Sequence, residues 1–250
     1  MHVDGILGAA RDHPSYLEPQ LGNQTGPLFL DAIYNQGLIS ELTFSLHLNT
    51  ESERSSLDYG APNLSDVRRG DFPQPISMIE EDFFWAQYCQ GVAIGDSWRD
   101  TYRWGRIEDY PKQIGNGSIY SIFDTGTPFL MISALYYDSL ISKIFLTMPS
   151  RVIWRFDDDL RVLTECEADY PSISFMFDQK WIEVRAQDYV FQEQDDDFCY
   201  FLIAPVDLPF NILGVPIFNG YYSIFEQKPV PQISFAPLQD SNKRSILAGS

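Results

Sequence analysis

The chain has 250 residues, enough for one large domain or two small ones with a well-buried core. Asp and Glu total 35 against 17 Lys and Arg, which gives a formal net charge of -18. This balance argues against binding to nucleic acid, whose phosphates require a basic surface, and against binding to an anionic membrane surface. Because 15% of the residues are aromatic and 44% are apolar, we expect a folded acidic protein and not a disordered tail.

No segment of the sequence resembles a signal peptide or a membrane span. Met1 is followed by no basic region and by no apolar stretch of signal-peptide length. The longest nearly apolar segment, residues 128–137, is too short and too polar at its ends to cross a bilayer. We therefore predict no membrane partner and no nucleic-acid partner. The three cysteines, Cys89, Cys166 and Cys199, are odd in number, so their count leaves the redox compartment open.

The first two predicted elements are a helix and a strand. Between Pro27 and Gly37, the spacing of Phe29, Ala32 and Ile33 predicts a short amphipathic helix with these three side chains on its apolar face. The apolar run at residues 119–123 predicts a strand.

A second helix and four further strands follow in the predicted order. The helix covers residues 132–144, and its apolar stripe consists of Ile132, Leu135, Tyr136, Leu140 and Ile144. The strands cover residues 172–177, 181–184, 221–225 and 233–235, and the first two form a hairpin around residues 178–180. Many strands and few helices, without βαβ alternation, predict a mainly-β domain.

The segment that carries chemistry is Ile122-Phe123-Asp124-Thr125-Gly126-Thr127. An apolar strand ends in a carboxylate, and Gly126 permits a sharp turn whose backbone N–H groups can bond that carboxylate. The hydroxyl groups of Thr125 and Thr127 can brace it. Taken alone, the Asp-Thr-Gly triplet is equally compatible with an ordinary turn at the end of a strand.

In this segment and several others the sequence resembles the pepsin-type aspartic proteases. The matching segments occur in the family's order over nearly the whole chain. They are residues 4–8, 35–39, 44–49, 124–127, 211–214, 221–225 and 233–237. Two positions depart from the family pattern, Pro128 after the signature and Val215 after Gly214. These departures concern the fine shape of the site and leave the carboxylate in place.

The resemblance implies a mainly-β, pepsin-like acid protease lobe with antiparallel sheets and two or three short helices. It implies that Asp124, Thr125, Gly126 and Thr127 form a catalytic signature, in which Asp124 is one of two catalytic carboxylates. Thr125 would brace the loop across the lobe interface, and Thr127 would bond the carboxylate. A disulfide between Cys166 and Cys199 is implied as well.

Members of this family take one such Asp from each of two lobes, but no second Asp-Thr-Gly or Asp-Ser-Gly occurs here. Asp58-Tyr59-Gly60 lacks the hydroxyl, and Asp96-Ser97-Trp98 lacks the glycine. The segment order predicts that residues 1–36 are the closing strand and helix of a first lobe and that residues 37–250 are the C-terminal catalytic lobe. We accordingly expect a truncated sequence, with the first catalytic Asp upstream of Met1.

Three functions remain open from the sequence. The leading one is an aspartic endopeptidase that needs no cofactor or metal and cleaves a peptide or protein, with the missing lobe or a second chain as its partner. The others are a non-catalytic binding or structural subunit with a single lobe, and a homodimer with one Asp from each chain. The resemblance implies a secreted or a lysosome- or vacuole-like location.

The remaining candidate groups are better explained without a role in chemistry. His2, His13 and His47 are scattered along the chain, and Cys89 has no neighbouring histidine, so we expect a buried, inert thiol. The acidic runs at residues 157–159 and 195–197 are typical of solvated loop tips, with a cation site as the minor alternative.

Overall fold

A computed structural model describes residues 7–11, 28–50, 54–80, 82–95, 118–148, 151–157, 160–193 and 197–246. Several residues discussed above lie outside these ranges, namely His2, His13, Pro27, Asp96 to Trp98 and parts of both acidic runs. No helix in the described ranges is long and apolar enough to cross a membrane.

The described part of the chain is built mainly from short strands. The first half contains α2 (Phe29–Asn35), β1 (Thr43–Asn49), β2 (Arg54–Tyr59), the 3-10 turn η2 (Leu64–Asp66), β3 (Gln74–Ser77), β4 (Ala86–Cys89), β5 (Gly91–Ile94) and β6 (Ile119–Phe123). The middle contains β7 (Leu130–Ser133), α3 (Ala134–Thr147), β8 (Trp154–Phe156), β9 (Val162–Thr164), β10 (Ile173–Phe177), β11 (Lys180–Val184), α4 (Ala186–Tyr189) and β12 (Val190–Gln192). The last part contains β13 (Cys199–Phe201), β14 (Ile203–Val206), β15 (Asn211–Leu213), α5 (Val215–Phe218), β16 (Tyr221–Glu226) and β17 (Gln232–Pro237).

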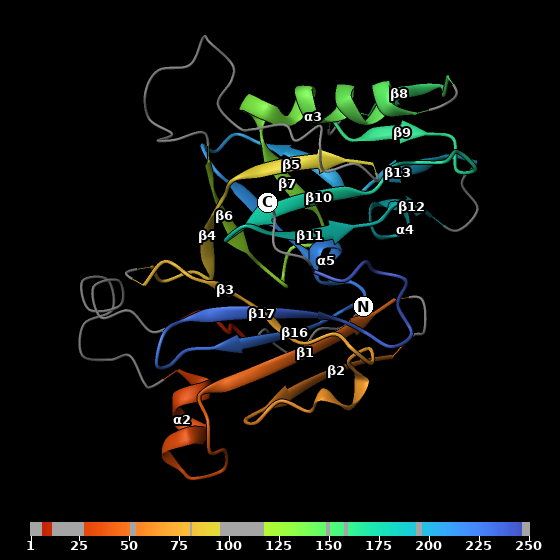
Figure 1. Ribbon diagram of the computed structural model, residues 1–250. Coiled ribbons are helices and arrows are strands. Elements are labelled where there is room, and N and C mark those ends of the chain that lie inside the picture. Colours follow the sequence, from red (N-terminus) through yellow and green to blue (C-terminus); the bar gives the residue numbers. More distant parts are fainter. Residues whose placement is uncertain are drawn as a thin grey trace.

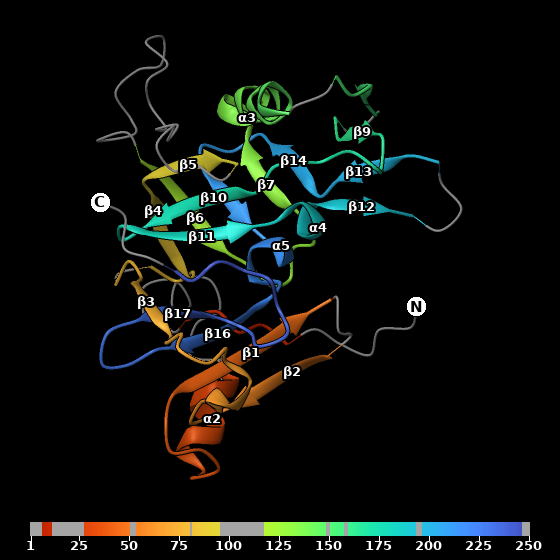
Figure 2. The ribbon, with the colours of Figure 1, turned by 45° about the vertical axis from the view of Figure 1, so that its right-hand side comes forward.

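The strands form four sheets in two stacked bodies. An antiparallel sheet of order β2-β1-β16-β17-β3 forms the lower body in Figure 1, with α2 beside it. The upper body holds the sheets β14-β7-β15-β6-β4, β11-β10-β5 and β12-β13-β9-β8, and α3 covers its top. Figure 2 shows the same two bodies after rotation. The mainly-β prediction is thus confirmed.

Aromatic side chains join the two bodies in one continuous core. Phe44 of β1 stacks on Phe225 of β16, with ring centroids 4.4 Å apart. Phe235 of β17 lies 5.9 Å from Phe123, the last residue of β6 in the upper body. Burial of each such ring stabilises the fold by about 1.5–3 kcal/mol. These aromatic contacts therefore hold the end of β6 against the lower sheet.

The sheet that contains β6 is mixed, a feature that the sequence did not predict. β15 pairs in parallel with β6 and antiparallel with β7, and β14 pairs in parallel with β7. The predicted hairpin is present as β10 and β11, whose two-residue turn has positive φ at Asp178 and Gln179. Two positive φ values in sequence give the turn a twist that matches the strands it joins.

Both predicted helices exist, but their details differ from the predictions. Ile132 lies in β7 and not in the second helix, because residues 130–133 pair with two neighbouring strands and α3 starts only at Ala134. In α2, Leu30 is buried in the core and the predicted Ile33 packs against it half-buried, whereas Phe29 is 41% exposed. The Phe29 ring makes an edge contact with Tyr59. Two further helices, α4 and α5, are single turns that the periodicity did not predict.

After β17 the chain returns along the upper body, where Lys243 forms a buried ion pair. Lys243 Nζ lies 2.5 Å from Asp188 Oδ2 and donates to the Glu183 carbonyl oxygen at 2.7 Å. Arg244 pairs with the Glu183 side chain at 2.6 Å. Burial lowers the pKa of Lys243, while the neighbouring Asp188 opposes this shift. Gly220 lies against the Lys243 side chain, and a Cβ at position 220 would be 2.9 Å from Lys243 Cε. The φ of Gly220, +77°, also favours glycine at this position.

Candidate active site

Asp124 stands where the buried strand β6 meets an open loop. Its backbone N–H donates to the Leu213 carbonyl at 3.0 Å, which extends the pairing of β6 with β15 by one residue. Its carbonyl accepts from Thr127 N–H at 3.2 Å and closes a tight turn. The strand is therefore fixed up to Asp124, and the carboxylate emerges partly exposed at its end.

Two donors from its own turn hold the Asp124 carboxylate. The Gly126 N–H donates to Oδ1 at 2.9 Å, and Thr127 Oγ1 donates to Oδ2 at 2.7 Å. A Cβ at position 126 would lie 3.2 Å from Oδ1, so the close approach favours glycine. Both donors are neutral, so they orient the carboxylate without cancelling its charge.

The structure assigns no such contact to Thr125. Its side chain is exposed beside Asp124, and its hydroxyl makes no hydrogen bond within the described residues. The role across a lobe interface therefore stays a prediction.

Gly214 packs against the loop of residues 124–129 and helps to hold it, a function that the sequence did not predict. Its N–H donates to the Phe129 carbonyl at 3.0 Å, and Val215 N–H donates to the Thr127 carbonyl at 2.8 Å. A Cβ at position 214 would lie 2.0 Å from the Thr127 carbonyl oxygen, so no larger residue fits. Val215, noted above as a departure from the family pattern, thus contributes through its backbone, whatever its side chain.

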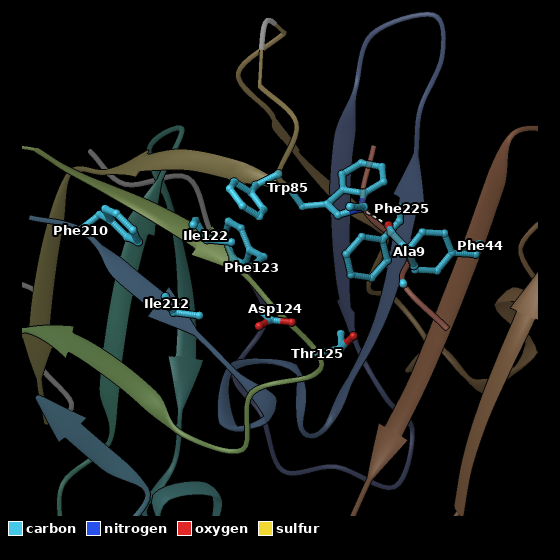
Figure 3. A pocket seen from close by; sticks show the side chains of 13 residues that line it. Ala9, Phe44, Trp85, Ile122, Phe123, Asp124, Thr125, Phe210, Ile212 and Phe225 are labelled. Atoms are coloured by element: carbon cyan, nitrogen blue, oxygen red, sulfur yellow. Dashed lines mark hydrogen bonds between the residues drawn. The ribbon is translucent and has the colours of Figure 1, made fainter. Parts of the chain in front are cut away.

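An apolar cavity of about 350 Å³ opens beside Asp124 and Thr125. Figure 3 shows the Asp124 carboxylate between two groups of apolar side chains. One group comes from the upper body, and the other includes residues of the lower sheet. The principal apolar side chains around the cavity are Phe44, Phe84, Trp85, Ile122, Phe210, Ile212 and Phe225. A low-polarity environment next to a carboxylate strengthens electrostatic interactions there.

The residues 8–10 form a further wall of this cavity. Neither this wall nor the aromatic lining was identifiable from the sequence, because the contributing segments lie far apart in the chain. The one available signal was the density of aromatic residues in the sequence, which does not say which of them meet.

The other candidate groups lie elsewhere. His47 is buried on β1 with its Nδ1 3.2 Å from Asp66 Oδ2, and it does not line the cavity. Cys89 is a buried free thiol at the end of β4. No group of three or more His, Cys, Asp or Glu in the described ranges is placed to hold a metal ion.

The predicted disulfide is confirmed. Cys166 and Cys199 are bonded, with their Cα atoms 5.0 Å apart. Cys199 begins β13, which pairs with β9 just before Cys166. The disulfide therefore links two neighbouring parts of the sheet on the right-hand side of the upper body in Figure 1.

The candidate site of this mainly-β protein is thus a carboxylate at the end of a buried strand, held by its own turn beside an apolar cavity. A family model described as eukaryotic aspartyl protease matches residues 1–238, and the chain belongs to this family. It is 21% identical over 241 residues to mucorpepsin of Rhizomucor miehei, covering 94% of this chain and 53% of that protein. It is 22% identical over 209 residues to rhizopuspepsin-2 of Rhizopus niveus, covering 84% of this chain and 47% of that protein. The chain thus spans about half the length of these curated relatives.

Proposed function

We propose that the chain is the part of an aspartic endopeptidase that supplies one catalytic carboxylate, Asp124. The observation that carries the proposal is the partly exposed carboxylate, oriented by Gly126 N–H and Thr127 Oγ1 and facing an apolar cavity. Family membership supports the same class of activity.

The proposed chemistry needs a second carboxylate close to the first. Two carboxylates about 3 Å apart cannot both ionise, so the pair holds one proton. The ionised member removes a proton from a water molecule, which attacks the peptide carbonyl, while the protonated member donates to the carbonyl oxygen. The C–N bond then breaks, and the amine leaves with a proton from the pair. Thr127 and Gly126 keep Asp124 in place, and no metal or organic cofactor takes part.

The second carboxylate has no matching signature within the 250 residues. We therefore propose that it comes from a first lobe or from a second chain. In this proposal residues 1–36 complete the first lobe, and residues 37–250 are the C-terminal catalytic lobe. Thr125, exposed beside Asp124, would then contact the partner.

The substrate in this proposal is an extended peptide or protein segment. It would lie along the cavity and pair with the protein through backbone hydrogen bonds, as extended peptides do at sheet-rich sites. Enzymes of this chemistry suit a secreted or lysosome- or vacuole-like compartment, which we propose for this chain.

Cleavage of an unfolded protein at acidic pH, with and without pepstatin, tests the assignment. We expect pepstatin-sensitive cleavage that Asp124→Asn abolishes. Cleavage that survives Asp124→Asn would overturn the assignment. Light scattering on the same sample distinguishes a second copy of this chain from another partner, because it gives the mass of the active species.

The lack of a second signature favours one alternative, a non-catalytic single-lobe subunit that binds or supports another protein. A folded, monomeric chain that cleaves nothing would favour that function.

A further inference from the structure

Arg11 is a buried cation close to the candidate site, and nothing in the chemistry proposed above uses it. Only 6% of its surface is exposed. Its guanidinium donates to the carbonyl oxygens of Ile79 at 2.6 Å, Glu80 at 2.7 Å and Phe84 at 3.4 Å. The backbone N–H of Arg11 donates to the Phe83 carbonyl at 3.1 Å.

These acceptors belong to the turn that leads from β3 into β4. A planar guanidinium can bond two separate carbonyl groups at once because its N–H groups point in fixed directions. A lysine ammonium is a compact charge and cannot reproduce this fork. Arg11 therefore joins two segments that lie about seventy positions apart in the chain, residues 8–11 and 79–84.

Trp85 makes the second link between the same segments. Its indole Nε1 donates to the Ala9 carbonyl at 2.8 Å, the dashed contact in Figure 3. The Arg11 guanidinium carbon lies 5.8 Å from the centre of the Trp85 ring. A cation over an aromatic ring adds attraction that increases with burial.

Arg11 is charged, and its acceptors are neutral. Burial lowers its pKa, while the charges of Asp82 and Glu80, together with Tyr120, oppose this shift. The Asp82 carboxylate is engaged elsewhere, since it accepts from Phe84 N–H at 3.0 Å and from the Tyr120 hydroxyl. The guanidinium is thus committed to the backbone of the turn.

The linked segments are two walls of the cavity beside Asp124. Gly8, Ala9 and Ala10 line one wall, and Phe84 and Trp85 line the next. Because the first wall has no side chain larger than a methyl group, side-chain packing contributes little to its position. The Arg11 fork and the Trp85 bond supply that anchoring instead.

We propose that Arg11 is a positioning residue that fixes the wall 8–10 and thereby sets the width of the cavity beside Asp124. The consequence for catalysis rests on the proposed endopeptidase function. The effect of Arg11 on the position of the wall does not depend on that function. The position of the wall and the effect on catalysis can therefore be tested separately.

The structural test compares Arg11→Met and Arg11→Lys with Arg151→Met in the full chain. Arg151 is exposed, which makes it a matched control. The readout is Trp85 fluorescence, obtained by subtracting the spectrum of Trp85→Phe, together with amide hydrogen exchange at residues 8–11. We expect a red shift of Trp85 emission and faster exchange in both Arg11 variants, and neither change in Arg151→Met. Unchanged Trp85 emission and unchanged amide exchange in folded Arg11→Lys would overturn the proposal. If Arg11→Met does not fold, the result for the milder Arg11→Lys variant is the one that counts.

The kinetic test uses the active, assembled enzyme and peptides that differ only in the size of one apolar side chain. We expect Arg11→Lys to raise KM roughly tenfold for the best substrate with kcat little changed, because a displaced wall weakens ground-state and transition-state binding alike. Wild-type KM values for all peptides would overturn the role in positioning. If the wild-type enzyme cleaves nothing, the endopeptidase proposal fails, while the fluorescence result still decides the role of Arg11.

Discussion

The carboxylates of Asp124 and Asp188 have opposite surroundings. Asp124 is partly exposed beside an open cavity, and its donors among the described residues are two neutral groups of its own turn. The Asp188 side chain is 2% exposed and accepts from the Lys243 ammonium, from Asn219 Nδ2 and from the backbone of Arg185. Both carboxylates are hydrogen-bonded, so the presence of hydrogen bonds does not distinguish them.

The difference lies in charge compensation and access. A buried carboxylate opposite a buried ammonium is neutralised, and removal of either partner leaves an uncompensated charge. A carboxylate oriented by neutral donors keeps its charge available to a proton or a water molecule. The comparison thus assigns a structural role to Asp188, which holds the segment around Lys243 in place, and leaves Asp124 available for chemistry. Four variants test this difference.

Lys243→Met should have the largest effect. It leaves the Asp188 charge buried without its cation, so we expect a loss of about 3–5 kcal/mol in the free energy of unfolding. Urea unfolding followed by circular dichroism measures it. Lys228→Met, at an exposed position, serves as the control and should stay within about 0.5 kcal/mol of the parent. An unfolding midpoint unchanged by Lys243→Met would show that Asp188 does not depend on this cation.

Asp124→Asn should act on activity and not on stability. Under the proposed endopeptidase function we expect cleavage to fall at least about 100-fold, since a positioned acid–base group contributes this much or more. The amide keeps a carbonyl acceptor for Thr127 or Gly126, so thermal unfolding should change little. Asp169→Asn, also exposed, is the control for the loss of one charge. A large drop in the unfolding temperature of Asp124→Asn would show that Asp124, like Asp188, has a structural role.

Thr127→Val should have an intermediate effect. It removes the hydroxyl that donates to Asp124 Oδ2 at 2.7 Å while it keeps the shape of the side chain. Because a hydrogen bond to a charged group is worth about 1.5–3 kcal/mol, we expect cleavage to fall roughly tenfold or more. Steady-state kinetics measures the loss. Thr127→Ser restores the donor and should recover most of the activity, and equal activity of the Val and Ser variants would contradict the role of the hydroxyl.

Thr125→Ala should have the smallest effect on stability. Its hydroxyl makes no hydrogen bond within the described residues, so we expect the free energy of unfolding to change by less than about 0.5 kcal/mol. Affinity for the first lobe or second chain proposed to supply the second carboxylate should nevertheless decrease, which light scattering on a dilution series can detect. Unchanged affinity would remove the proposed contact across the interface.

The local features of this protein follow from short stretches of sequence. The strand at residues 119–123 and the hairpin around residues 178–180 arise from alternation and turn chemistry that operate over a few residues. The carboxylate of Asp124 and the donors at Gly126 and Thr127 lie within four consecutive positions. Each of these was predictable because the interacting groups are neighbours along the chain.

Features that depend on distant partners were not predictable in this way. Ile132 fits a helical stripe, yet pairing with two neighbouring strands places it in β7. Gly214 lies in a segment that matches the family pattern, but its role became clear only from the Thr127 carbonyl oxygen, which lies 2.0 Å from where a Cβ would be. Lys243 follows polar residues in the sequence, and the packing of distant segments makes it one of the most buried side chains.

The sequence by itself therefore determined the chemistry of the candidate site, a strand-end carboxylate with its own donors, as well as the mainly-β class. Only the tertiary structure decided the surroundings, namely the apolar cavity, the wall anchored by Arg11 and the buried pair of Lys243 with Asp188. The reason is physical. Hydrogen bonds within a turn need only neighbouring residues, whereas burial and charge compensation depend on which distant segments the packed core brings together.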